Sequence, residues 1–155
     1  MATIRCVFIG ASGVGKTTLL TRAAGRRHIV LPTIGVNNML FCYKNIQYQC
    51  WDTSGAEKFK VLSKIFIRNT SQCVYMYDPS RPETFDENDI PHNALIIANV
   101  QNFNGILPEN HTQVDVGDDE SIRQFLDILR LCSGISPVEI HQPQDSSTTC
   151  CCWGT

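Results

Sequence analysis

Hydrophobic and polar residues alternate with two different periods along the chain, and the change of period predicts the order of its strands and helices. Apolar residues spaced i, i+3, i+4 and i+7 within 119–131 indicate an amphipathic helix, and the continuous apolar run 94–100 indicates a strand buried on both faces. The expected strands are 4–9, 36–43, 46–51, 72–77, 94–100 and 111–116, and the expected helices are 18–24, 80–90 and 119–131. Strands that alternate with helices in this way predict an α/β fold with a mostly parallel central sheet.

A glycine-rich motif separates the first expected strand from the first expected helix. It reads Gly10-Ala11-Ser12-Gly13-Val14-Gly15-Lys16-Thr17 and is followed by Thr18, which is the G-x-x-x-x-G-K-T pattern of a phosphate-binding P-loop. Glycines let successive backbone N–H groups close around phosphate oxygens, and the helix N-terminus adds a favourable field. Lys16 is expected to reach the β- and γ-phosphates, and Thr17 to offer its hydroxyl to Mg²⁺. The strand–loop–helix order predicts a P-loop NTPase fold with helices on both faces of the sheet.

A second motif, Asp52-Thr53-Ser54-Gly55, follows the expected strand 46–51. Asp52 is expected near the Mg²⁺ shell, and the N–H of Gly55 can face a terminal phosphate without a side chain in the way. Thr33, between the two motifs, would add a second hydroxyl to the metal only when the third phosphate is present. The predicted metal ligands are therefore Thr17, Thr33 and Asp52, in a region ordered by one nucleotide and released by the other.

The length and composition of the chain predict one domain followed by a tail. At 155 residues, of which 43% are hydrophobic, the chain accommodates a domain at 1–132 and a flexible tail at 133–155. The net charge of −2 gives no electrostatic basis for nucleic-acid binding. Four of the eight cysteines fall within expected strands and three are adjacent at the end, so free thiols in a reduced, cytosolic chain are expected rather than disulfides. Neither a signal peptide nor an apolar run near the about 20 residues of a membrane span is expected.

These motifs resemble the Ras superfamily of small GTPases and, within it, the Rab branch. The Rab-like stretches, over residues 1 to about 87, are Thr33-Ile34-Gly35-Val36, Trp51-Asp52-Thr53-Ser54-Gly55, Glu57-Lys58-Phe59-Lys60, Phe66-Ile67-Arg68-Asn69 and Tyr77-Asp78-Pro79-Ser80. The resemblance implies a protein that binds GTP and GDP with Mg²⁺ and acts as a nucleotide-dependent switch in vesicle traffic. It also implies contacts with effector and regulatory proteins through 31–38 and 55–69. Trp51 and Phe66 or Ile67 match members of a Rab aromatic triad, and Asn38 stands where an aromatic residue is usual.

Three functional elements depart from the family pattern. Ala56 stands where the family glutamine orients the attacking water, and a methyl group forms no hydrogen bond, so very slow hydrolysis is expected and no residue is assigned a catalytic role. The base-reading motif N-K-x-D is replaced by residues 99–102, which leaves Asn99 and Asn102 as candidate base-binding residues, and Asp115-Val116-Gly117 replaces the family S-A-K element. Because Asn102 offers a donor where an aspartate accepts, guanine binding is expected to weaken by about 1–3 kcal/mol and xanthine to compete. The alternative is that both asparagines are ordinary loop residues.

The chain is also short for the family. Most of the helix expected after Phe85 and the helix expected within 102–111 are missing, and both would cover the same face of the sheet. That face is therefore expected to be under-covered, with less shielding for Leu95, Ile96 and Ile97. Repacking of other segments, a partner on this surface or a marginally stable domain would each account for the shortfall.

The chain ends in Cys150-Cys151-Cys152-Trp153-Gly154-Thr155. Rabs often end with paired cysteines followed by a few residues, so the resemblance implies lipid attachment at Cys151 and Cys152, and two lipid chains give stable anchoring. A cytoplasmic protein on the cytosolic face of an intracellular membrane is then expected. An unmodified cysteine-rich end is the alternative.

Two other functions stay open at this point. A pseudo-GTPase would use the domain as a lipid-anchored binding module without nucleotide cycling, and Ala56 and Asn102 favour this reading. Another P-loop enzyme, such as a nucleotide kinase, is disfavoured by Asp52-Thr53-Ser54-Gly55 directly after Trp51 and by the lack of an arginine-rich lid.

Overall fold

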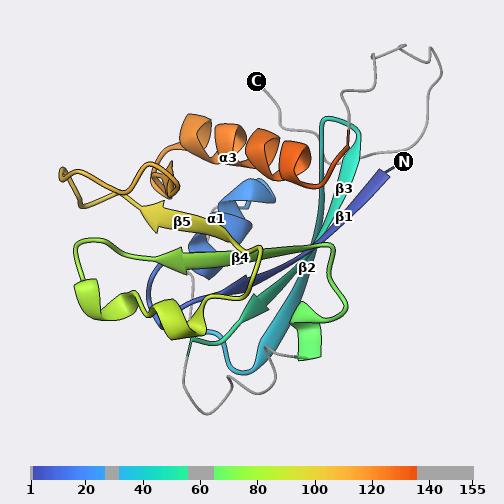
Figure 1. Cartoon of the computed structure of the whole chain (residues 1–155). Coiled ribbons are helices and arrows are strands. Elements are labelled where there is room, and N and C mark those ends of the chain that lie inside the picture. Colours follow the sequence, from blue (N-terminus) through green and yellow to red (C-terminus); the bar gives the residue numbers. More distant parts are fainter. Residues whose placement is uncertain (1, 27–31, 56–64, 136–155) are drawn as a thin grey trace.

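A six-stranded mixed sheet forms the centre of the computed structural model, which describes residues 2–26, 32–55 and 65–135 (Figure 1). The strands are β1 (Ala2–Ile9), β2 (Val36–Tyr43), β3 (Ile46–Thr53), β4 (Gln72–Tyr77), β5 (Leu95–Asn99) and β6 (Thr112–Val114). They lie in the order β2-β3-β1-β4-β5-β6, and every neighbouring pair is parallel except the antiparallel hairpin of β2 and β3. The predicted α/β fold with a mostly parallel sheet is confirmed.

Two helices, α1 (Lys16–Ala23) and α3 (Asp119–Cys132), pack on one face of this sheet (Figure 1). α3 begins where its sequence predicts, because the carboxylate of Asp118 accepts hydrogen bonds from the backbone N–H groups of Glu120 and Ser121. The apolar residues of both helices are buried with those of the central strands, among them Ile4, Phe8, Leu19, Leu20, Ile97, Ile122, Phe125, Leu126 and Leu129. This packing fixes α1 against the sheet and thereby fixes the glycine-rich loop that precedes it.

The segment 80–90 is not the helix that its sequence predicts. It forms two short 3₁₀ helices, η2 (Pro82–Thr84) and η3 (Glu87–Asp89), separated by extended backbone at Phe85. The carboxylate of Asp86 accepts a hydrogen bond from the N–H of Asn88, and the N–H of Asp86 donates to the hydroxyl of Tyr75 in β4 at 2.9 Å. Such side-chain bonds to the backbone compete with a continuous helix. The prediction of a helix over 80–90 is therefore wrong.

The second face of the sheet carries a smaller apolar cluster. Val7, Ile9, Cys73, Tyr75, Tyr77 and Ala98 are buried there, and Phe85, Ile90 and Leu107 pack against them from the loops. Within the described residues, loops and 3₁₀ turns rather than long helices cover β4 and β5 on this face, as expected of an under-covered side. The prediction for Leu95, Ile96 and Ile97 needs correction, because strand side chains alternate between faces. Ile97 is fully buried and packs with Leu95 on the α3 face, so Ile96 alone of the three belongs to the thinner side.

The cysteines of the described residues are free thiols, as the sequence predicts. Cys6, Cys50 and Cys73 are buried, Cys42 is half-buried and Cys132 is exposed. Burial raises the pKa of Cys73 to about 12, which keeps this thiol neutral.

Some predicted features lie outside the described residues. They are Ala56, most of the partner-contact range 55–69, and the tail with Cys151 and Cys152. Among the helices that the structure describes, none is both long and apolar enough to cross a membrane.

Candidate phosphate and metal site

The glycine-rich loop leads from β1 into α1 and adopts backbone conformations that favour glycine. Gly10 has a φ of 135°, and Gly15, the N-cap residue of α1, has a φ of 105°. A Cβ atom at Gly10 would lie 1.9 Å from the carbonyl oxygen of Met76 in β4, so no side chain fits there. The glycines of the motif therefore allow the chain to turn tightly against β4 before α1 begins.

The loop presents backbone donors at the start of α1. Gly15 offers no side-chain cap to this helix, whose first turn holds no acidic residue. Within the described residues, no backbone–backbone hydrogen bond of the turns and loops uses the N–H of Gly13, Val14 or Gly15. Available N–H groups at a helix N-terminus, together with the positive end of the helix dipole, fit a phosphate group.

Lys16 places its ammonium group inside the curve of this loop. Only 5% of the residue is exposed, and Nζ donates to the carbonyl oxygens of Gly10 and Ala11 at 2.9 and 2.7 Å. Burial lowers the pKa of Lys16 to about 8, although the carboxylate of Asp52 acts in the opposite direction. A buried cation of this kind suits an anionic ligand, because a phosphate would favour its charged form.

Three oxygen-bearing side chains from separate segments meet beside Lys16. Oδ2 of Asp52 accepts hydrogen bonds from the hydroxyls of Thr17 and Thr33 at 2.5 and 2.9 Å, and the two hydroxyl oxygens lie 2.9 Å apart. Oδ1 of Asp52 is buried and has no hydrogen-bond partner among the described residues. Burial raises the pKa of Asp52, while both hydroxyls and the charge of Lys16 oppose that rise. The three predicted metal ligands thus lie in mutual contact.

This set of donors fits Mg²⁺. The ion prefers oxygen ligands and usually takes one or two carboxylates together with waters and substrate phosphates. A cation would also give the buried Oδ1 of Asp52 the partner that it lacks. Over the described parts of the chain, no cluster of three or more His, Cys, Asp and Glu side chains could hold a metal. A metal here would depend on Asp52, the hydroxyls of Thr17 and Thr33, and the phosphates of a ligand.

The segment after β3 passes close to the loop. A Cβ atom at Gly55 would lie 2.2 Å from the backbone nitrogen of Ser12, so this approach requires glycine. The N–H of Ser54 donates to the carbonyl oxygen of Gly35 at 2.7 Å, which ties the segment to the one that carries Thr33. The contacts enclose a hollow of about 240 Å³, lined by Ser12, Gly13, Gly15, Lys16, Thr17, Thr18, Pro32, Thr33, Thr53, Ser54 and Gly55. Most of the predicted phosphate- and metal-binding residues therefore line one space.

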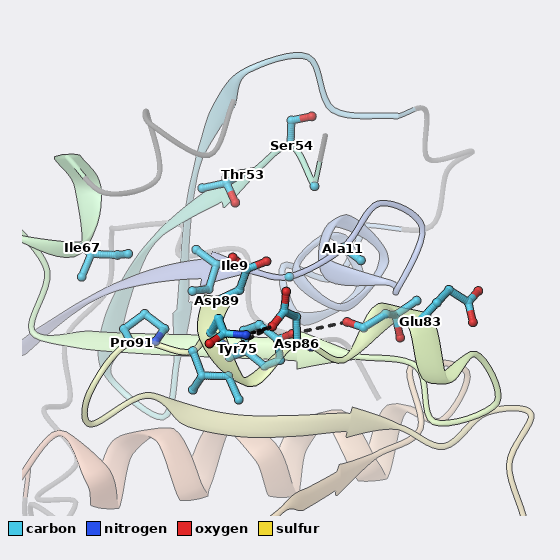
Figure 2. A pocket seen from close by; sticks show the side chains of 15 residues that line it. Ile9, Ala11, Thr53, Ser54, Ile67, Tyr75, Glu83, Asp86, Asp89 and Pro91 are labelled. Carbon is cyan, nitrogen blue, oxygen red and sulfur yellow. Dashed lines mark hydrogen bonds between the residues drawn. The ribbon is translucent and has the colours of Figure 1, made fainter. Parts of the chain in front are cut away.

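A larger cavity of about 500 Å³ shares Thr53, Ser54 and Gly55 with this hollow and extends over the thinly covered face of the sheet, where Ile9 and Tyr75 line it (Figure 2). Its charged lining residues are the acidic Glu83, Asp86 and Asp89, and no lysine or arginine of the described residues lines it. Carboxylates repel phosphate groups, so size alone does not identify the phosphate site. The smaller hollow, which holds Lys16, matches the predicted chemistry.

The two asparagines predicted to contact the base lie in different surroundings. Nδ2 of Asn99, at the end of β5, donates to the carbonyl oxygen of Val14 at 3.0 Å and so braces the glycine-rich loop. Asn102 is exposed in the turn that follows. Gln101 lies next to Gly117, where a Cβ atom would come within 2.8 Å of its Nε2, so the turn and the 115–117 loop are neighbours. The structure thus brings Asn99 to the loop and leaves Asn102 at the surface.

Arg81 contacts the loop although the sequence did not single it out. Its Nη2 donates to the carbonyl oxygen of Gly13 at 2.8 Å, across 68 positions of sequence. In the sequence, this contact is indicated only by the position of the arginine directly after Tyr77-Asp78-Pro79-Ser80. The strand β4 ends there, at the same edge of the sheet as the glycine-rich loop.

Part of the predicted partner surface is described. The rings of Trp51 in β3 and Phe66 lie 6.0 Å apart between centroids, and Asn38 of β2 pairs with Trp51 in the hairpin. Asn38 is exposed, while Trp51, Phe66 and Ile67 are half-buried. The two matching aromatic residues and the polar substitution therefore lie on one surface.

The chain is similar in sequence to a protein family and to several known proteins. Residues 5–105 match the family model described as Ras of Complex, Roc, domain of DAPkinase. The chain is 37% identical over 82 residues to Ras-related protein Rab-7B of Dictyostelium discoideum, a match that covers 52% of this chain and 42% of that protein. It is 34% identical over 124 residues to Ras-related protein RABG1 of Arabidopsis thaliana (74% and 61% covered) and 30% identical over 134 residues to Ras-related protein Rab7 of Pisum sativum (78% and 64% covered). The matches thus span less than two thirds of each of these relatives.

Proposed function

The chain belongs to the Ras superfamily of small GTPases, and from this premise we propose that it is a Rab-like nucleotide-dependent switch. It binds GTP and GDP with Mg²⁺ and hydrolyses GTP slowly. The family match and the similarity to Rab proteins support the nucleotide, and the hollow around Lys16 supports the phosphate site.

The observation that carries this proposal is the contact of Thr17, Thr33 and Asp52. Thr17 belongs to α1, Asp52 to β3, and Thr33 to the segment that leads into β2. Bound Mg²⁺ supplies positive charge that offsets the charge of the phosphates. Thr33 would serve as a metal ligand together with the third phosphate and would lose this role when that phosphate is lost, so that the conformation of the segment before β2 would depend on the nucleotide.

Slow hydrolysis follows from the side chain at position 56. Alanine neither donates nor accepts a hydrogen bond, so it does not hold the attacking water in line with the terminal phosphate. We expect A56Q to increase the single-turnover rate of GTP hydrolysis by at least about tenfold, since an aligned water contributes on this scale. A hydrolysis rate of A56Q equal to that of the unchanged chain would show that alanine at position 56 is not the cause of slow hydrolysis.

A role in membrane traffic and lipid attachment at Cys151 and Cys152 belong to the same proposal. They are supported by the Rab resemblance and by the adjacent cysteines at 151 and 152. Two prenyl groups would hold the chain on the cytosolic face of a membrane. Mass spectrometry of the chain from eukaryotic cells tests this, with C151S/C152S as the control.

The first test of the switch is to identify the nucleotide that copurifies with the unmodified chain. Bound GTP is expected, because the pocket holds nucleotide and hydrolysis is slow. Exchange of bound nucleotide should accelerate when Mg²⁺ is chelated, and T33A should reduce the Mg²⁺ effect for GTP more than for GDP. The matched control is T112A, which removes a threonine hydroxyl in β6 that does not line the hollow around Lys16.

A second candidate, a pseudo-GTPase that serves as a binding module, is favoured by the exposure of Asn102 and by Ala56. It predicts a chain that stays empty with added guanine nucleotide and Mg²⁺. Loading with GTP or GDP at physiological concentration, followed by a Mg²⁺-dependent release, would exclude it.

A further inference from the structure

Arg81 reaches the glycine-rich loop from the segment that follows β4. Its Nη2 donates to the carbonyl oxygen of Gly13 at 2.8 Å, and its Nε donates to the carboxylate of Asp78 at 2.9 Å. Asp78 also accepts hydrogen bonds from the hydroxyl and the backbone N–H of Ser80. Burial opposes ionisation of Asp78, but the hydrogen bonds from Ser80 and Arg81 outweigh it and lower the pKa. A charged Asp78 therefore orients the guanidinium toward the loop.

The contact with a carbonyl matters because a trans peptide unit points its C=O and its N–H in opposite directions. Arg81 holds the carbonyl of Gly13, so the next N–H, that of Val14, points away from Arg81. Asn99 holds the carbonyl of Val14 at 3.0 Å, so the N–H of Gly15 points away from Asn99. Two side chains thus brace consecutive peptides of the loop by their carbonyl groups and leave the N–H groups for a ligand. A charged donor on the carbonyl also polarises the peptide and strengthens its N–H as a donor.

The same region lacks a cation that the family motif would supply. Val100 stands where the motif has lysine, and it packs as a partly buried side chain against the apolar cluster of the second face. Tyr77 of β4 pairs with Ala98 of β5, so the segments that carry Arg81 and Val100 leave neighbouring strands at the same edge of the sheet. Arg81 therefore carries a positive charge at the same edge of the sheet, where position 100 carries none.

We propose that Arg81 is a nucleotide-positioning residue, which holds the glycine-rich loop in its binding conformation and supplies beside the nucleotide the positive charge that Val100 lacks. The inference rests on the proposed binding of guanine nucleotide and extends it to a residue outside the known motifs.

The chain offers a closely matched control in Arg123. The side chains of Arg81 and Arg123 are 40% and 41% exposed, and each forms an ion pair with a carboxylate three positions earlier in the sequence. Arg123 lies on α3 and pairs with Glu120 at 3.0 Å. A difference between R81A and R123A therefore reports the contact with the loop rather than the loss of a surface ion pair.

The test measures the affinity of the full chain for a fluorescent GDP with Mg²⁺, by equilibrium titration of the unchanged protein, R81A, R123A, V100K and R81A/V100K. Thermal unfolding of each nucleotide-free chain monitors folding, and R81M, which keeps the apolar stem, replaces R81A if R81A does not fold. We expect R81A to weaken binding about tenfold, as for loss of one charge-assisted hydrogen bond, and R123A to change it by less than about twofold. V100K should restore most of the affinity to R81A and add little to the unchanged chain.

Equal affinities for R81A and R123A would overturn the inference and leave the proposed function standing. A loss in R81A that V100K does not restore would also overturn it, because Arg81 would then act on the loop without replacing the missing charge. An unchanged chain that binds no guanine nucleotide would refute the proposed function itself, and the role of Arg81 with it.

Discussion

The phosphate end and the base end of the candidate site are built in different ways. At the phosphate end, Lys16, Thr17, Thr33 and Asp52 are joined by hydrogen bonds of 2.5 to 2.9 Å among themselves and to the loop backbone. At the base end, Asn102 is exposed, and the described residues give it no hydrogen-bond partner. The side chains proposed to bind phosphate and Mg²⁺ are therefore held together, while Asn102, proposed to contact the base, is exposed.

This difference indicates that phosphate binding and base recognition can be lost independently of each other. The phosphate end depends on backbone N–H groups and on a glycine at position 10 that sits against β4, so any change there disturbs the fold as well as the site. The base end depends on side chains of two loops on the surface, and a substitution there costs little stability. Binding driven by phosphates with weak base selectivity is the expected outcome.

Substitution of Lys16 should break the phosphate end most strongly. K16M removes the buried ammonium and should weaken GDP binding by about 3 kcal/mol or more, roughly a hundredfold, because hydrogen bonds to charged groups are worth about 1.5–3 kcal/mol each. The control is K44M, since Lys44 is an exposed lysine that pairs with Asp127 away from the loop. Equilibrium titration measures both. Equal losses in the two variants would contradict the assignment of Lys16.

The pH dependence of the free energy of unfolding tests the environment of Lys16 at the phosphate end in the nucleotide-free chain. Burial lowers the pKa of Lys16 to about 8 in the folded chain, so the unfolded chain binds more protons between that value and the ordinary lysine pKa. Below this pH window, the buried and charged Lys16 therefore lowers the free energy of unfolding. This destabilisation disappears as the pH rises through the window. Relative to K16M, the unchanged chain should gain about 2–3 kcal/mol between roughly pH 7 and pH 10, measured by urea unfolding. Saturating nucleotide should remove the gain, because the phosphates favour charged lysine.

Neutralisation of Asp52 should remove the metal from the phosphate end. D52N keeps the size of the side chain but loses the charge, so Mg²⁺ should no longer strengthen GDP binding. We expect a loss of about 2 kcal/mol, roughly thirtyfold, when Mg²⁺ is present and little change when it is chelated. D127N, which changes a half-buried carboxylate on α3 that pairs with Lys44, is the control. A Mg²⁺ effect of the same size in D52N and the unchanged chain would place the metal elsewhere.

Restoration of an acceptor at the base end should have the smallest effect. N102D offers guanine two acceptor oxygens and should shift the preference from xanthine toward guanine nucleotide by about 1 kcal/mol, roughly fivefold to tenfold. N104D makes the same chemical change two positions later on an exposed residue and serves as the control. Competition titration of the two nucleotides measures the ratio. An unchanged ratio would mean that position 102 takes no part in base recognition.

Local patterns predicted the parts of the fold that depend on neighbouring residues. The glycine-rich motif fixes a turn between β1 and α1 because its φ angles and close contacts admit glycine, and the spacing of Ile122, Phe125 and Leu129 defines a helix that the core then buries. The contact of Thr17, Thr33 and Asp52 was expected from the spacing of two motifs, and the three residues lie together.

Long-range contacts decided what the sequence did not predict. The segment 80–90 breaks into η2 and η3 because Tyr75, in β4, accepts a hydrogen bond from the backbone of Asp86, and no local pattern contains that bond. Arg81 meets Gly13 only because β1 and β4 are paired in the sheet. The three apolar residues at the start of β5 separate onto two faces, which a continuous apolar run does not reveal.

The hydrogen bond from Ser54 to Gly35, at 2.7 Å, joins the two segments that follow the predicted metal ligands Thr33 and Asp52. A protein that binds either segment would therefore also affect the conformational equilibrium of the other. By thermodynamic linkage, the factor by which the nucleotide changes the affinity for that protein equals the factor by which the protein changes the affinity for the nucleotide. An effector that prefers the triphosphate form would raise the affinity of the chain for GTP by this factor. If hydrolysis is slow, as proposed from alanine at position 56, the concentration of such an effector would help to set how long the GTP-bound state lasts.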